Sequence, residues 1–162
     1  MRQLLQIIIS VSVAFSLFGC GFQLRDNYQL PASMQNVAIE ASAFSEFRSV
    51  LKQRFELAGA ELVTPSDAGL IIAIMDDQLT RRTLSLSQSG QVAEYELIYT
   101  VTYQLLQPDT PAREFQVEVY RDYQDDPNFA LAKTREREVL VTEMRDEAAR
   151  QLLRQTIAQL SQ

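Results

Sequence analysis

Between residues 95 and 105, a large apolar side chain occupies every second position. These side chains belong to Tyr95, Leu97, Tyr99, Val101, Tyr103 and Leu105. The polar residues that alternate with or precede them are Glu94, Glu96, Thr100, Thr102 and Gln104. Because successive side chains of a strand point to opposite faces, this pattern predicts a long strand with one covered and one polar face. The chain must therefore build a sheet whose apolar side is covered by another layer.

The segments on either side of this strand predict its neighbours in the sheet. Residues 87–90 read Ser-Gln-Ser-Gly and predict a hairpin tip, with a strand over residues 70–86 before it. Residues 108–111 contain two prolines and predict a second turn. Alternation resumes at Phe115 and continues up to Tyr123. Three successive antiparallel strands are expected, two of them unusually long.

Two helices are predicted from apolar residues at three- and four-residue spacing. For the first, Ser42 and Ser45 are candidate N-caps, and Gly59 stands where a left-handed C-terminal cap is needed. The second is expected to begin with Asp126 as N-cap and Pro127 at the first helical position. The apolar stripes comprise Phe44, Phe47, Val50, Leu51, Phe55 and Ala58 in the first helix, and Leu140, Val141, Met144, Ala148, Ala149, Leu152, Leu153, Thr156, Ile157 and Leu160 in the second.

A short strand over residues 36–41 precedes the first helix, so the element order is β-α-β-β-β-α. This order predicts an α+β two-layer sandwich, in which two helices pack on one face of a four-stranded, mostly antiparallel sheet. We expect one domain over residues 36–162.

The N-terminal segment is typical of an export signal. Arg2 supplies a positive charge, and residues 4–18 are apolar apart from Gln6 and three serines. This run is too short and too interrupted for a good membrane-spanning helix. We therefore expect residues 1–19 to be removed, residues 20–35 to form a tether, and 143 of the 162 residues to remain.

The end of this segment, Leu-Phe-Gly-Cys at residues 17–20, resembles the signal of bacterial lipoproteins. That resemblance implies cleavage before Cys20 and acylation of its thiol and its new amino group. Several acyl chains hold a protein on a membrane almost irreversibly. Residue 21 is Gly rather than the Asp that retains such lipoproteins in the inner membrane, so the outer membrane is the expected location. The alternative is a buried cysteine that merely follows an apolar segment.

Composition argues against several kinds of function. The chain has no His and a single Cys, so it cannot build a Ser-His-Asp or Cys-His arrangement or a thiol-imidazole zinc site. Its net charge of −6 argues against nucleic acid as a partner. The acidic pairs at residues 76–77 and 125–126 could hold calcium or act as acid and base. However, strand neighbours point to opposite faces, and the second pair precedes a helix, where negative charge is favourable. We expect no enzyme, cofactor or metal.

Basic residues at the ends of elements predict a phosphate-binding site. Arg81 and Arg82 lie near the hairpin tip, and Lys133, Arg135 and Arg137 lie in the first turns of the last helix. Arginine and lysine both pair with phosphate oxygens. The alternative is a solvated basic surface, since two glutamates interleave with the second cluster.

Four segments, in the same order, resemble the LptE family of lipopolysaccharide-assembly lipoproteins, also called RlpB. They read CGFQLRD with LP (residues 20–26 and 30–31), GQVAEYE (90–96), DPNFALAK (126–133) and EMRDEAARQL (143–152). The resemblance covers essentially the whole mature chain. It implies a sheet flanked on one side by two helices, in agreement with the pattern above.

The resemblance also implies a function. LptE proteins act as plug and assembly partner inside the LptD β-barrel, which delivers lipopolysaccharide to the outer leaflet. They are expected to bind lipopolysaccharide through basic residues near the hairpin tip and the start of the last helix. Lys133 matches the helix position, whereas Gln88 and Ser89 replace the basic residue expected at the tip, so Arg81 or Arg82 would substitute for it. The alternative is a free periplasm-facing lipoprotein that binds a soluble ligand or inhibits an enzyme.

Overall fold

The computed structural model describes Gln3, residues 30–42 and residues 45–161. The expected lipid-attachment residue Cys20, the rest of the expected signal segment and most of the tether lie outside this part. The elements are η1 (Ala32–Met34), β1 (Asn36–Glu40), α2 (Glu46–Leu57), β2 (Glu61–Leu62), β3 (Leu70–Leu86), β4 (Val92–Gln107), β5 (Thr110–Gln124), η2 (Pro127–Phe129) and α3 (Ala130–Leu160).

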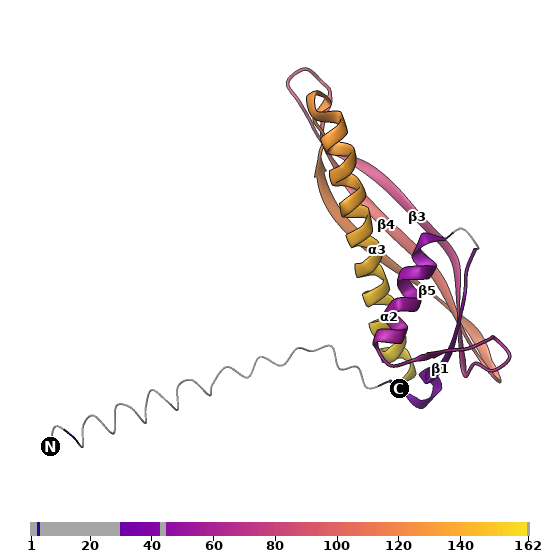
Figure 1. The fold of residues 1–162 in the computed structure, drawn as a ribbon. Coiled ribbons are helices and arrows are strands. Elements are labelled where there is room, and N and C mark those ends of the chain that lie inside the picture. Colours follow the sequence, from indigo (N-terminus) through magenta and orange to yellow (C-terminus); the bar gives the residue numbers. More distant parts are fainter. Residues whose placement is uncertain (1–2, 4–29, 43–44, 162) are drawn as a thin grey trace.

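The predicted α+β class is confirmed, with α2 and α3 side by side on one face of the sheet (Figure 1). The sheet has five strands in the order β2-β1-β3-β4-β5, rather than the predicted four. The additional strand β2 has two residues, which is too short for alternation to reveal it. β1 runs parallel to both β2 and β3, and the β3–β4–β5 meander is antiparallel.

The long strands and α3 extend the domain well beyond β1 and α2. β3, β4 and β5 contain 17, 16 and 15 residues, and α3 contains 31. The β3–β4 hairpin tip and the start of α3 lie together at one end (Figure 1). η1 and the C-terminal end of α3 lie at the opposite end. The predicted basic positions near the tip and in α3 are therefore neighbours in space.

The core lies between the sheet and the helices, as the apolar stripes predict. The alternating residues of β4 from Leu97 to Leu105 are all buried, and both helices contribute buried stripes. Those stripes are Phe47, Leu51 and Phe55 from α2, and Val141, Met144, Ala148, Ala149, Leu152, Leu153 and Thr156 from α3. Phe44 lies outside the described residues. Met34 is fully buried and Leu30 packs against the core, so residues 30–35, which the sequence places in the tether, contribute to the domain.

The predicted ends of α2 are confirmed, whereas the second helix begins later than predicted, because a 3-10 turn separates Asp126 from α3. Ser45 caps α2 by accepting a hydrogen bond from the Arg48 amide at 3.2 Å. Gly59 has a φ of 93°, which is the left-handed conformation that the end of this helix requires. Asp126 accepts a hydrogen bond from the Asn128 amide at 2.9 Å and caps η2, and α3 follows directly from Ala130.

Candidate functional site

Lys133 lies in the first turn of α3 and is held against the end of β5. Its ammonium is 5.6 Å from the ring centre of Tyr123, and the Tyr123 hydroxyl donates a hydrogen bond to the Lys133 carbonyl at 3.0 Å. Its Nζ also donates to Glu136 at 2.9 Å, and this hydrogen bond raises the pKa of the lysine. Lys133 is therefore a charged group of defined position.

Arg81 on β3 lies over the ring of a tyrosine on β4, just as Lys133 lies over Tyr123 on β5. Its guanidinium carbon lies 4.6 Å from the ring centre of Tyr95, a distance that favours a cation–π contact. Tyr95 and Tyr123 are directly paired across β4 and β5. The structure thus places two cations over two adjacent tyrosines, and we call Arg81, Tyr95, Tyr123 and Lys133 the tyrosine cradle.

Arg82 does not join the tyrosine cradle. Its side chain points to the opposite face of the sheet, where its guanidinium pairs with Glu96 at 2.6 Å and its side chain is 65% exposed. Neighbouring residues of a strand point to opposite faces, so Arg81 and Arg82 cannot reach one ligand together. Of the two arginines near the tip, the structure brings only Arg81 to the side of Lys133.

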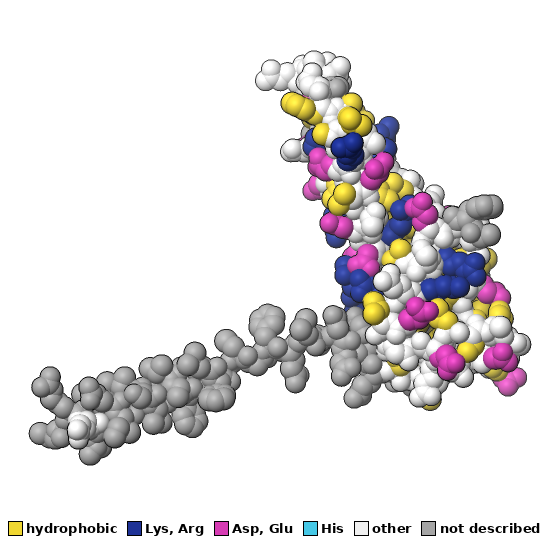
Figure 2. All heavy atoms as spheres, in the orientation of Figure 1, with side chains coloured by type: hydrophobic (Ala, Val, Ile, Leu, Met, Phe, Trp, Pro, Cys, Tyr) yellow, Lys and Arg dark blue, Asp and Glu magenta, His cyan; other side chains and the backbone are white. Residues whose placement is uncertain are grey.

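Apolar surface surrounds the tyrosine cradle at the same end of the domain. Leu84 and Leu86 on β3, and Phe129 and Leu131 at the start of the last helix, are 45%, 62%, 64% and 70% exposed. Figure 2 shows hydrophobic side chains gathered around this end, interspersed with charged ones. Exposed apolar side chains beside fixed cations suit a ligand that has both an anionic and an apolar part.

A cavity of about 410 Å³ adjoins the tyrosine cradle near Tyr123. Three of its lining residues are acidic, namely Glu94, Asp122 and Glu136. Such a lining repels anions, so an anionic ligand must meet Arg81 and Lys133 from outside this cavity.

One member of each acidic pair has a structural role. Asp77 faces the helices and accepts hydrogen bonds from the Ser45 hydroxyl at 3.1 Å and the Tyr99 hydroxyl at 2.8 Å. Asp76 lies on the other face and is exposed, as the alternation predicts. Asp126 is the N-cap of η2. Within the described part of the chain, no cluster of three or more His, Cys, Asp or Glu residues could hold a metal ion.

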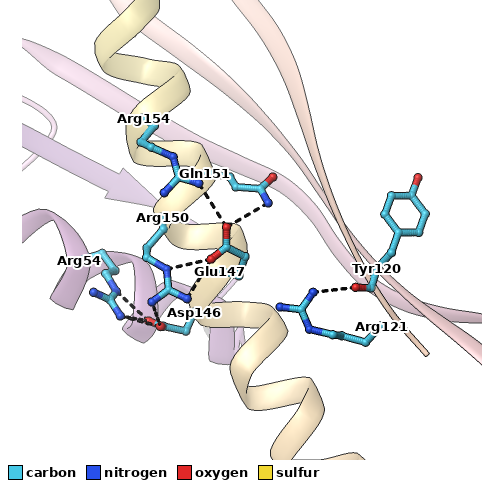
Figure 3. A network of polar contacts seen from close by, with 8 residues as sticks. All are labelled: Arg54, Tyr120, Arg121, Asp146, Glu147, Arg150, Gln151 and Arg154. Carbon is cyan, nitrogen blue, oxygen red and sulfur yellow. Dashed lines mark hydrogen bonds and ion pairs between the residues drawn. The ribbon is translucent and has the colours of Figure 1, made fainter. Parts of the chain in front are cut away.

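The sequence reasoning missed a polar network that joins the two helices (Figure 3). Arg54 on α2 donates to both carboxylate oxygens of Asp146 on α3, at 2.5 to 2.7 Å. Arg150 pairs with Asp146 and with Glu147, each at 2.9 Å, and Arg154 pairs with Glu147 at 3.2 Å. The three- and four-residue spacing of the charged residues within α3 is visible in the sequence. The pairing of Asp146 with Arg54 on α2 is not. For the two tyrosines of the tyrosine cradle, the alternation likewise predicts an apolar strand face but no cation contact.

None of the helices among the described residues is both long and apolar enough to cross a membrane.

Comparison with known proteins extends over nearly the whole chain. The sequence model of the LptE family, described as lipopolysaccharide-assembly, matches residues 33–156. The LPS-assembly lipoprotein LptE of Pectobacterium atrosepticum is 30% identical over 159 residues, which cover 96% of this chain and 86% of the relative. The protein of the same name from Yersinia enterocolitica is 32% identical and covers 96% of this chain, with 76% of its own length matched.

Two solved structures share both the fold and recognisable sequence similarity. The crystal structure of rare lipoprotein B from Shewanella oneidensis has a TM-score of 0.69 and 38% identity, over 76% of this chain and 95% of that one. The solution structure of lipoprotein B from Nitrosomonas europaea has a TM-score of 0.72 and 32% identity, over 87% of this chain and 93% of that one. The chain therefore belongs to the LptE family of lipopolysaccharide-assembly proteins.

Proposed function

We propose that this protein is an outer-membrane lipoprotein that acts as plug and assembly partner of the LptD β-barrel and binds lipopolysaccharide directly. In this proposal, the protein and the LptD barrel together deliver lipopolysaccharide to the outer leaflet. The tyrosine cradle carries the binding part of this proposal. Membership of the LptE family and the names of its relatives as LPS-assembly lipoproteins support the assembly role. The protein is not an enzyme in this proposal.

The chemistry of the tyrosine cradle matches a phosphorylated glycolipid. Arg81 and Lys133 supply the charges that phosphate oxygens prefer, and the tyrosine rings hold the two cations in place. Lys133 has three N–H donors and gives one to Glu136, so two remain for a ligand. The exposed leucines and Phe129 around the site offer contacts to acyl chains.

The tether of the proposed anchor enters the domain at the other end. We propose that residues 1–19 are removed, that Cys20 carries the acyl chains, and that a tether leads to the domain. Cys20 and Leu30 are ten positions apart, a stretch that spans at most about 36 Å when extended. The domain begins at the end opposite the hairpin tip (Figure 1). This arrangement directs the tyrosine cradle away from the point where the tether enters the fold.

The face of the sheet away from the helices offers a polar surface to the proposed barrel. The register of β3, β4 and β5 places on it Asp76, Glu94, Glu96, Glu114, Glu118, Asp122 and Arg82. Arg82 neutralises the charge of Glu96, and the remaining carboxylates leave this surface acidic. A barrel wall that contacts this face must therefore supply cations or hydrogen-bond donors.

Lipopolysaccharide binding tests the tyrosine cradle, with Arg82 as a matched control. We expect Arg81→Gln and Lys133→Gln each to lower affinity roughly tenfold, because each removes a charge-assisted contact of ~1.5 kcal/mol or more. Arg82→Gln should leave affinity unchanged, since its side chain lies on the other face. The losses should shrink as salt is raised. Equal effects at residues 81 and 82, or none at residues 81 and 133, would reject the tyrosine cradle.

Purification from outer membranes in mild detergent tests the plug role. We expect a large β-barrel protein, LptD, to co-purify in a one-to-one ratio. A monomer with no barrel protein would instead favour a free periplasm-facing lipoprotein that binds a soluble ligand or inhibits an enzyme. The variants of the tyrosine cradle should retain the barrel protein, which separates the assembly role from lipopolysaccharide binding.

A further inference from the structure

A second cavity lies at the other edge of the sheet, where β1 and β2 diverge beside α2. The pairing of the two strands ends at Val37 and Leu62. Beyond this point, residues 38–41 and residues 62–65 form two walls, and α2 forms the third. The volume is about 560 Å³, within the roughly 300–1,000 Å³ typical of small-molecule sites.

Two cations from α2 line this cavity. Arg48 and Lys52 are four residues apart, so they lie on the same face of the helix one turn from each other. Neither side chain forms an ion pair or a hydrogen bond with another described residue, whereas Arg54, also on α2, is fully paired with Asp146. Figure 2 shows basic side chains gathered beside α2 on this face.

Arg48 carries an unsatisfied donor at this site. Its Nε is buried and has no hydrogen-bond partner in the described part of the chain. A buried N–H donor of a charged group lowers the stability of the fold when it has no acceptor. An unpaired donor of this kind in a native structure therefore indicates that a bound ligand or water accepts its hydrogen bond. An anion in the cavity would supply that acceptor.

The remaining walls restrict the class of anion. Glu40 also lines the cavity, so the local charge of the three ionisable residues is +1 on a protein of net charge −6. Most of the other lining side chains are apolar, including Ile39, Leu62 and Val63. The cavity is much larger than a phosphate group, so it has room for an apolar portion beside the phosphate.

We propose that this cavity is a phosphate-binding site, in which Arg48 and Lys52 hold the phosphate and the apolar walls contact the rest of the ligand. The phosphate belongs to a small phosphorylated amphiphile or to free phosphate. The site lies on the edge of the sheet formed by β1 and β2, whereas the tyrosine cradle is built on β3, β4 and β5. The inference therefore does not depend on the proposed function.

Calorimetric titration of the full acylated protein in dodecyl maltoside tests this site. The probes are inorganic phosphate, dihexanoyl phosphatidic acid and dihexanoyl phosphatidylcholine. We expect phosphate and phosphatidic acid to bind, and phosphatidylcholine, which has no net charge, to bind far more weakly. Tighter binding of phosphatidic acid than of phosphate identifies a lipid headgroup as the source, and equal binding identifies free phosphate. No binding of either anion overturns the proposal.

Variants locate the binding within the cavity. Arg48→Gln and Lys52→Gln should each weaken the binding of phosphatidic acid about tenfold, and the double variant should abolish it. The matched control is Arg113→Gln, because Arg113 lies on β5 at the opposite edge of the sheet. Circular dichroism verifies that each variant is folded. Unchanged binding in the double variant, or an equal loss in the control, would overturn the assignment. All these titrations are made in the Arg81→Gln, Lys133→Gln background, so that the tyrosine cradle does not contribute to the binding.

Discussion

The hydroxyl of Tyr123 donates a hydrogen bond to the carbonyl oxygen of Lys133 at 3.0 Å, and the Lys133 ammonium lies 5.6 Å from the centre of the same ring. One tyrosine at the end of β5 therefore holds both the backbone and the side chain of the first turn of α3. Because Tyr123 is also paired with Tyr95, the position of Lys133 relative to Arg81 depends on the sheet register.

Tyr123→Phe should distinguish the effect of the hydrogen bond to the Lys133 carbonyl from the effect of the ring contact with the Lys133 ammonium. The variant keeps the aromatic face but loses a hydrogen bond, so we expect the free energy of unfolding to fall by about 1 kcal/mol. Lipopolysaccharide affinity should fall several-fold because Lys133 is less well positioned. Tyr123→Leu, which also removes the ring, should lose more. Tyr120→Phe on the opposite face is the control, and an equal loss of affinity there would contradict this role.

Cys20→Ser should abolish acylation, because a hydroxyl cannot form the thioether. We expect no incorporation of labelled palmitate and an uncleaved precursor. The fold should be unchanged, since the described domain begins ten residues later, at Leu30. Palmitate incorporation into the Ser variant would contradict the proposed attachment site.

Asp77→Ala should destabilise the fold far more than Asp76→Ala. Without the Asp77 carboxylate, the Tyr99 hydroxyl has lost its acceptor, and this side chain is only 2% exposed. An unsatisfied buried hydroxyl costs about 1–3 kcal/mol. Asp76 is exposed, so its removal should change stability by less than about 0.5 kcal/mol. Urea denaturation of both variants measures the difference, and equal midpoints would refute the role of Asp77.

Stability should decline at alkaline pH because of Tyr103. Burial raises the pKa of this phenol from 10.0 to about 12, and the neighbouring Thr156 hydroxyl opposes this rise only in part. The neutral phenol is thus favoured in the folded state. This contribution is fully present below pH 10 and is lost as the pH rises towards 12, at up to about 1.4 kcal/mol per pH unit. Tyr103→Phe should flatten the decline in denaturation curves recorded between pH 9 and pH 11.5. An equally steep decline would exclude Tyr103 as its cause.

Asp146→Asn should loosen the contact between the two helices. The carboxylate of Asp146 accepts hydrogen bonds from Arg54 and pairs with Arg150, and the side chains of Asp146 and Arg54 are about 30% exposed (Figure 3). We expect a loss of about 1–2 kcal/mol in thermal or urea denaturation, because charge-assisted bonds are lost. Glu143→Gln, an exposed change on the same helix, should have almost no effect.

The sequence alone predicted the features that depend on local periodicity and on caps. The alternation from Tyr95 to Leu105 predicted the buried face of β4, Gly59 was predicted as the end of α2, and its N-cap was one of two candidate serines, Ser42 and Ser45. These features depend on residues within a few positions of one another. The segments that carry the family resemblance are also read directly along the chain.

Only the tertiary structure decided which distant residues meet. β2 has two residues, and its pairing with β1 depends on the connection through α2 rather than on its own pattern. Likewise, the sequence placed Arg81 and Arg82 near the tip, but a bulge between Ile74 and Asp76 helps to set which of them faces Tyr95. A single-residue shift in register exchanges the two faces of a strand, and register is set by packing across the whole sheet.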